Sequence, residues 1–340
     1  VKEGNMPKNF ELCKEGDVAF ADASEDTNEV AKVIELFNLD NKDIVCGLHT
    51  IHGRDNKNKT IVGFKGYAFS SSAFHNQIRR IAQGTKIYSI STKNFSECYV
   101  GIPSKAEQTK IATLLRLIDE RIATQNKIIE KLQSLIKGLN DNIHKGIKGE
   151  TVCFSDLGEA YSGLSGKGGD DFGYGEPFIT YMNVYQNTYI SEKDYELVQI
   201  APNEKQNSVQ YGDALFTLSS ETPEEVGIGA VYLGNTQKLY LNSFCFGIHF
   251  YDERVLPQYL AHFISSSSFR RAIYPLAQGS TRFNLQKNDF MKMKFLLPSL
   301  EKQGHIANTL DALHCRLANE KSLTEQYILL KKYLLSLMFI

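Results

Sequence analysis

The chain contains 340 residues, of which 42% are hydrophobic and 23% are charged, and its formal net charge is −1. This composition is ordinary for a globular protein, and the length suits two domains. No apolar run approaches the ~20 residues of a membrane-spanning helix, and no signal peptide precedes the first polar residues, so we expect no membrane association and a cytoplasmic location.

The cysteines are scattered along the chain and form neither a CxxC pair nor a zinc-site spacing. We interpret them as small core or surface residues of a reduced protein. His49 and His52 stand three positions apart, but no third ligand lies nearby in the sequence, so we expect no metal site. The six cysteines are Cys13, Cys46, Cys98, Cys153, Cys245 and Cys315.

Residues 1–102 predict a domain rich in short strands and turns. Residues 17–20 alternate as a short strand, and residues 61–69 and 99–102 also predict strands. Residues 72–82 predict a short helix.

Residues 103–146 carry the pattern of a long helix. Pro103 ends a strand-like run, Ser104 can cap the helix, and Glu107 completes the spacing of a capping box. Apolar residues then recur in alternating steps of four and three, interrupted by Gln125, which is typical of a coiled coil. At ~1.5 Å per residue the helix is roughly 60 Å long, too long to be buried in one small domain. Its predicted seam consists of Ile111, Leu115, Ile118, Ile122, Ile129, Leu132, Ile136 and Leu139.

Residues 151–297 predict a second strand-rich domain after a short linker. The glycine-rich residues 162–171 lack the spacing of a phosphate-binding loop, and we interpret them as an exposed loop. Residues 178–185 alternate as a strand. Further strands are predicted for residues 213–217, 228–233 and 244–250.

Residues 298–340 repeat the long helix at an offset of 195 residues, so that Gln303 matches Gln108. The register slips by one residue near Glu320. Gln125 and Glu320 each lie near the middle of their helix, where they could meet in a polar layer or could equally face solvent. The predicted seam of this helix consists of Ile306, Leu310, Leu313, Leu317, Leu330 and Leu334.

The repeat extends into the domains. Residues 70–74 match residues 265–269, and Gln83-Gly84 matches Gln278-Gly279 at the same offset. Gly16-Asp17 matches Gly212-Asp213 with one residue of slippage, so the chain contains a duplicated unit of domain and long helix. The second copy has about 60 residues before its Gly-Asp pair, whereas the first has 15, so we expect the first domain to lack roughly 45 amino-terminal residues.

The run from Pro103 to Ile122, with its Glu107-Gln108 and Lys110-Ile111-Ala112 segments, resembles the conserved helix of type I restriction-modification specificity subunits. Residues 212–213, 221–227 and 278–285 are similar to the target-recognition domains of that family. The chain departs from the pattern where His314 replaces the Asp119 of the first helix, and in its shorter first domain.

The resemblance implies an α+β fold with two target-recognition domains, 1–102 and 151–297, and two long helices, 103–146 and 298–340, packed as an antiparallel coiled coil. It implies a non-catalytic subunit that reads a split target in double-stranded DNA, docks methyltransferase subunits on the helices and joins a nuclease/translocase subunit. S-adenosylmethionine is then expected on the partner methyltransferase, with no cofactor on this chain. A coiled-coil scaffold that does not read DNA is the alternative.

Positive charge gathers in both copies, in residues 74–96 and 269–294. Such a run is commonly a solvated face, but its recurrence favours a phosphate-facing surface. The candidates for phosphate contact are Arg79, Arg80, Lys86, Lys93, Arg270, Arg271 and Lys287. Arg, Asn and Gln side chains suit base edges, which selects Arg282, Asn284 and Gln286. Further candidates are Lys167, Thr217, Ser219, Thr222 and Thr281.

Overall fold

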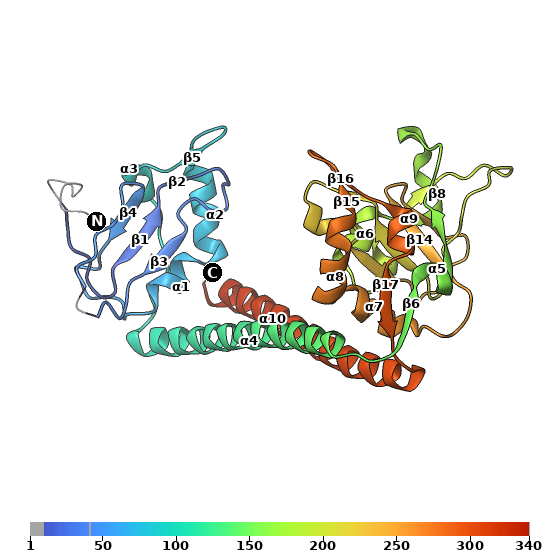
Figure 1. Ribbon diagram of the computed structural model, residues 1–340. Coiled ribbons are helices and arrows are strands. Elements are labelled where there is room, and N and C mark those ends of the chain that lie inside the picture. The colour runs from blue at the N-terminus through green and yellow to red at the C-terminus, as the bar shows by residue number, and fades with distance from the viewer. Residues whose placement is uncertain (1–9, 41, 340) are drawn as a thin grey trace. The chain divides into compact units, whose positions relative to one another are not determined.

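The computed structural model describes residues 10–40 and 42–339, which divide into two compact units (Figure 1). Unit 1 consists of residues 1–129 and 319–340, and unit 2 of residues 130–318. Each unit combines small β-sheets with helices, so the predicted α+β fold class is confirmed. Within the described residues, no helix has the length and apolar character needed to cross a bilayer.

Unit 1 is organised around a three-stranded antiparallel sheet with the strand order β3-β1-β4. A two-stranded sheet pairs β2 with β5. Phe20 on the central strand and Phe74 and Ile78 on α2 are buried together in the core. The elements are β1 (Val18–Ala21), β2 (Ala23–Ser24), β3 (Val33–Glu35), β4 (Thr50–Gly53), α1 (Lys65–Phe69), α2 (Ser72–Ile81), β5 (Tyr88–Ser89) and α3 (Thr92–Phe95).

Unit 2 repeats this arrangement and adds to it. Its main antiparallel sheet has the order β12-β10-β14-β7, in which β12, β10 and β14 correspond to β3, β1 and β4. Three smaller sheets have the orders β11-β16-β15, β13-β8-β9 and β17-β6. The strands are β6 (Glu150–Cys153), β7 (Gly158–Ser162), β8 (Phe172–Ile179), β9 (Tyr195–Val198), β10 (Ala214–Thr217), β11 (Ser219–Ser220), β12 (Gly229–Val231), β13 (Tyr240–Leu241), β14 (Cys245–Phe250), β15 (Ala277–Gln278), β16 (Phe283–Leu285) and β17 (Lys294–Leu297).

The helices of unit 2 contribute buried side chains to its cores. The largest core lies around Phe154, Phe216 and Phe290, a second around Ile179, Leu215 and Tyr232, and a smaller third consists of Leu164, Phe178 and Val198. The α-helices are α5 (Phe154–Leu157), α6 (Tyr181–Gln186), α7 (Pro257–Ile264), α8 (Ser267–Ile273) and α9 (Lys287–Met291). The 3₁₀ helices are η2 (Gly169–Asp171), η3 (Glu192–Asp194), η4 (Pro223–Glu225) and η5 (Tyr274–Leu276).

The two long helices are α4 (Lys105–Lys145) and α10 (Leu300–Met338). The first part of α4 and the last part of α10 belong to unit 1, and the remainder of both helices belongs to unit 2. In unit 1, Asp119 of α4 binds Lys331 of α10 at 2.6 Å. In unit 2, Leu139 near the end of α4 shares a core with Ile306 near the start of α10. Because the first half of each helix packs on the second half of the other, the pair is antiparallel.

A buried polar pair lies in the middle of the helix seam. Gln125 Nε2 donates to Glu320 Oε2 at 2.6 Å, which confirms that these equivalent residues meet. Beyond this layer the seam of α10 continues at Thr324, Tyr327 and Lys331. Lys331 therefore takes the inward position that the sequence analysis gave to Leu330, which is 44% exposed. The inward positions of α10 continue in alternating steps of three and four from Leu317 through Glu320 to Lys331, so the predicted register slip near Glu320 is wrong.

Each long helix is fastened to its own domain by a buried glutamine. Gln108 accepts the Ile61 N–H at 2.9 Å and donates to the carbonyls of Lys59 and Pro103. In unit 2, Gln303 accepts the Leu256 N–H and donates to the carbonyls of Arg254 and Pro298. All partners are related by the 195-residue offset, so the repeat preserves the complete hydrogen-bond set. The predicted cap is also present, because Ser104 Oγ accepts the Glu107 N–H at 3.3 Å.

Three predicted strands are wrong. Residues 65–69 form α1, because the Glu35 carboxylate accepts the N–H groups of Gly63 and Gly66 where the helix begins. Strand β8 ends at Ile179, and Thr180 caps the short helix α6, so residues 181–185 are helical. Residues 99–102 form no strand. Alternation over a few residues does not distinguish these short helices from strands.

Candidate nucleic-acid interface

A serine-capped helix followed by a tight hairpin occurs in both units (Figure 1). Ser71 accepts the Phe74 N–H at the start of α2, and Ser266 accepts the Phe269 N–H at the start of α8, both at 3.3 Å. The chain then turns back through residues 83–89 in unit 1 and 278–284 in unit 2, which we call the two recognition hairpins. Each pairs with a short strand, β2 or β11, in matching register.

A glycine sets the shape of each hairpin. Gly84 has a φ of +139° and Gly279 a φ of +148°, values that favour glycine over other residues. A Cβ at Gly84 would lie 1.8 Å from the Ile87 carbonyl oxygen, and one at Gly279 would lie 2.0 Å from that of Arg282. The backbone alone therefore determines the turn, and the side chains at its tip are left free for contact.

The hairpin of unit 2 presents polar and basic side chains to solvent. Thr281, Arg282 and Asn284 are exposed, and Asn284 lies opposite the exposed Gln278 in the β15–β16 ladder. The Arg282 guanidinium lies 5.5 Å from the ring centre of the exposed Phe244. This cation–π contact orients the guanidinium without using its hydrogen-bond donors. The hairpin therefore offers amide and guanidinium donors from one turn.

The hairpin of unit 1 has the same backbone but different side chains. Its exposed residues include Gln83, Thr85, Lys86 and Ile87, where Ile87 stands at the position of Arg282. Gln83 and Gln278 were not selected from the sequence, although their recurrence next to the glycine was the available signal. Phe244, which contacts Arg282, comes from a segment distant in sequence, so no local sequence pattern predicts this contact.

Other predicted DNA contacts are instead occupied by contacts within unit 2 or are buried. Arg270 is half-buried and donates to the carbonyl oxygens of Glu224, Val226 and Gly227 at 2.6–2.7 Å, and desolvation lowers its pKa. Lys167 binds Glu204 at 2.6 Å, and this contact lowers the pKa of that carboxyl to about 2. Thr217 and Ser219 are buried in their strands.

The remaining candidates lie on exposed or half-exposed surface. Arg79 donates to the Asn28 side chain at 2.6 Å. Gln286 and Lys287 are half-buried at the start of α9, which follows the hairpin in the chain. The exposed candidates outside the two hairpins are Arg79, Arg80, Lys93, Thr222 and Arg271. The structure thus brings Thr281, Arg282 and Asn284 together on one turn of unit 2, while Arg79, Arg80 and Lys93 lie in unit 1.

Comparison with known proteins identifies relatives along most of the chain. A family model described as the type I restriction modification DNA specificity domain matches residues 1–134 and 148–326. The type I restriction enzyme EcoKI specificity subunit of Escherichia coli strain K12 is 25% identical over 279 residues. That match covers 74% of this chain and 58% of the relative, so the chain spans little more than half of the relative's length.

Solved structures share the fold. A chain from work on complex assembly and conformational transition of the type I R-M system superposes with a TM-score of 0.65 at 15% identity, covering 98% of this chain and 84% of that one. The S subunit from M. genitalium gives a TM-score of 0.54 at 13% identity, with the same coverage. The HsdS subunit from Thermoanaerobacter tengcongensis gives 0.52 at 16% identity, covering 99% and 84%. At these identities the likeness is one of fold.

Proposed function

Because this chain belongs to the type I restriction modification DNA specificity family, we propose that it reads a split target in double-stranded DNA through the two recognition hairpins. The observation that carries this proposal is the glycine-defined turn, repeated in both units with different exposed side chains at its tip. Two similar readers with different tips suit a target made of two dissimilar halves. Each hairpin then contributes its own base preference.

The chemistry of the unit 2 hairpin suits base edges. An arginine can donate two hydrogen bonds to guanine, and Asn or Gln can pair with adenine in the major groove. Arg282, Asn284 and Gln278 supply these groups on neighbouring positions of one hairpin. Arg271 and Thr222 are the nearby exposed candidates for phosphate contact, which positions a protein on DNA without specifying sequence.

In unit 1 the proposed reader is chemically different. Lys86 offers a single cation at the tip, and Ile87 offers an apolar surface suited to a thymine methyl group. Arg80 and Lys93 provide exposed positive charge for phosphates. We therefore expect the two half-sites to differ in sequence.

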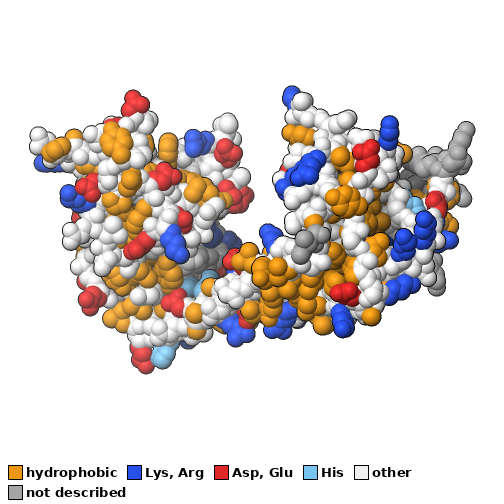
Figure 2. Space-filling view, turned by 180° about the vertical axis from the view of Figure 1, so that it is seen from behind, with side chains coloured by type: hydrophobic (Ala, Val, Ile, Leu, Met, Phe, Trp, Pro, Cys, Tyr) orange, Lys and Arg blue, Asp and Glu red, His pale blue; other side chains and the backbone are white. Residues whose placement is uncertain are grey.

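We further propose that the long helices dock methyltransferase subunits. Leu329, Tyr333 and Leu337 follow one another at four-residue steps on α10 and are all exposed, with Leu117 exposed on α4 of the same unit. Figure 2 shows hydrophobic side chains gathered over the long helices. Exposed apolar patches of this kind mark protein interfaces. In this proposal the chain is non-catalytic, S-adenosylmethionine binds to the methyltransferase, and a nuclease/translocase subunit completes the complex.

The test is a selection from randomised DNA by the chain assembled with its methyltransferase, comparing wild type with Arg282→Ala. Loss of a bidentate base contact should weaken binding of the preferred site roughly 5- to 150-fold and relax the preference at one or two positions. Lys193→Ala, which removes an exposed charge on η3, is the matched control and should leave the preference unchanged. An unaltered preference in Arg282→Ala would remove the hairpin from the reading surface.

Docking is tested separately by co-purification. Tyr333→Asp should reduce recovery of the methyltransferase, because a charge replaces an apolar contact at the centre of the exposed face. Gln326→Asp, an exposed substitution on the same helix, should not. Equal recovery with both variants would favour docking elsewhere on the chain.

A further inference from the structure

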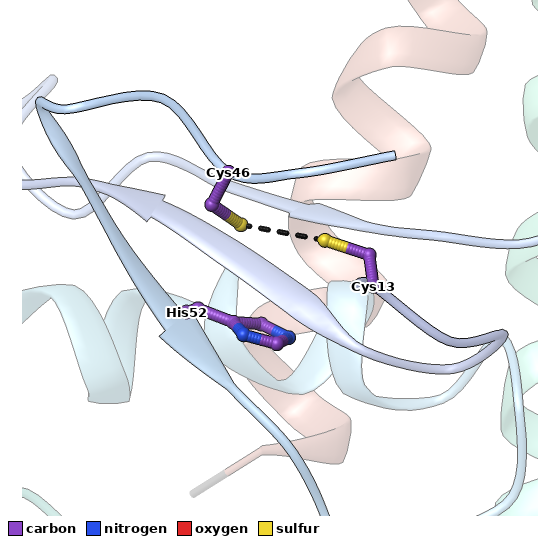
Figure 3. A group of neighbouring side chains, drawn as sticks. All are labelled: Cys13, Cys46 and His52. Atoms are coloured by element: carbon purple, nitrogen blue, oxygen red, sulfur yellow. Dashed lines mark hydrogen bonds between the residues drawn. The ribbon is translucent and has the colours of Figure 1, made fainter. Parts of the chain in front are cut away.

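Two cysteines and a histidine from separate segments converge in unit 1 (Figure 3). Cys13 lies before β1, Cys46 lies in the segment before β4, and His52 lies on β4. The sulfur atoms of Cys13 and Cys46 are 3.6 Å apart, and one ring nitrogen of His52 lies within 4.8 Å of both. In the part of the chain that the structure describes, no other group of three such side chains converges in this way.

The spacing is close to that of a tetrahedral zinc site. Zinc–sulfur bonds of ~2.3 Å place two thiolates about 3.8 Å apart, and zinc–nitrogen bonds are ~2.0–2.1 Å. The sulfur pair already meets this requirement. The imidazole has to approach by roughly 1 Å, a movement within reach of side-chain rotation on the edge strand of the described sheet.

A buried carboxylate holds the imidazole from behind. His52 Nε2 lies 2.8 Å from Asp17 Oδ2, and Asp17 is itself fixed by Arg54 and by the Lys14 N–H. Donation from Nε2 to a carboxylate leaves Nδ1 as the ligand nitrogen, the arrangement commonly found behind metal-bound histidines. The exposed Glu11 carboxylate lies 4.0 Å from Nδ1, where it or a water molecule can supply a fourth ligand.

The internal repeat shows that the fold does not require these residues. The Cys13 N–H donates to the Ile44 carbonyl as the Val209 N–H does to that of Leu239, which makes Val209 the counterpart of Cys13. The strand registers pair Val18 with Gly53 and Ala214 with Ile248, so Cys46 and His52 correspond to Leu241 and Gly247. Three positions that hold no metal ligand in unit 2 therefore hold two thiols and an imidazole in unit 1.

We propose that Cys13, Cys46 and His52 form a Zn²⁺ site that ties the segment before β1 and the segment before β4 to the sheet of unit 1. Thiolate and imidazole ligands favour zinc over magnesium or calcium. This proposal departs from the expectation of no metal site, because the ligands are distant in sequence and only the fold brings them together. It is independent of DNA reading.

The experiment measures Zn²⁺ binding to the full chain under reducing conditions and compares wild type with the double variant Cys13→Val/Cys46→Leu. These substitutions install the residues that unit 2 carries, so the fold should be retained, which circular dichroism verifies. Wild type should bind one Zn²⁺ per chain, and its thermal midpoint should rise by roughly 5 °C or more at saturating metal. The variant should lose both effects.

Cys315→Ala removes an exposed cysteine on α10 and is the control that should bind zinc as wild type does. Cobalt, used in place of zinc, should give thiolate-to-metal charge-transfer absorption in wild type and control but not in the double variant. Equal binding by the double variant and wild type, or no binding at micromolar zinc by folded wild type, would overturn the proposal.

Discussion

Replacing Gln303 with methionine tests whether the buried glutamine fastens α10 to its domain. Gln303 is fully buried and makes three hydrogen bonds of 2.7–2.9 Å, to one N–H and two carbonyls. Methionine has a similar volume and helix propensity but makes none of them, so one donor and two acceptors lose their partner. An unsatisfied buried polar group costs roughly 1–3 kcal/mol, and the carbonyls recover part of this from water, so we expect a loss of about 2–4 kcal/mol.

The measurement is urea unfolding followed by far-UV circular dichroism, since the chain contains no tryptophan. With a urea dependence of about 2 kcal/mol per molar, the midpoint of unit 2 should fall by roughly 1–2 M. Gln133→Met, an exposed glutamine on α4 in the same unit, is the matched control and should shift the free energy by less than about 0.5 kcal/mol. An unfolding midpoint for Gln303→Met equal to that of Gln133→Met would show that the hydrogen-bond set does not hold the helix to its domain.

Three further predictions concern other parts of the chain. Arg270→Met should destabilise unit 2 by roughly 2–4 kcal/mol without altering DNA base preference, whereas exposed Arg271→Met should leave stability nearly unchanged; chemical denaturation with a binding selection checks both. Burial lowers the pKa of His144 and His262, so the unfolded chain takes up protons first as pH falls below about 6.5. Unit 2 should therefore lose stability with falling pH until the folded-state pKa is passed. The dependence of unfolding free energy on pH should be weaker in His144→Phe and unchanged in His305→Gln, which alters an exposed histidine. Deleting one seven-residue repeat from α4 and its counterpart from α10 should change the gap between recognised half-sites while each half is kept, as mapped by methylation with the assembled complex; an unchanged gap in a folded variant would contradict the spacer role.

The sequence predicts most reliably where a pattern repeats over many residues. The 3.5-residue period located the long helices, and the equal offset of Gln125 and Glu320 indicated that they could meet. Short segments were less certain, because α1 is stabilised by the distant carboxylate of Glu35 and not by its own residues. Arg270 is a residue type that commonly contacts DNA, yet its guanidinium donates to three backbone carbonyls from another segment. Such tertiary environments leave no local pattern.

The glycine turns have a consequence for how new specificities arise. Since Gly84 and Gly279 determine the path of each hairpin, substitutions at residues 85–87 and 280–282 change what the tip presents while the backbone keeps its course. Arg282 and Ile87 already occupy the same turn position with opposite chemistry. Each hairpin thus accepts side-chain variation at small cost in folding free energy, and the two tips can diversify one at a time. Under the proposed function, specificity for the DNA target can therefore change through single substitutions, each of which leaves the chain folded.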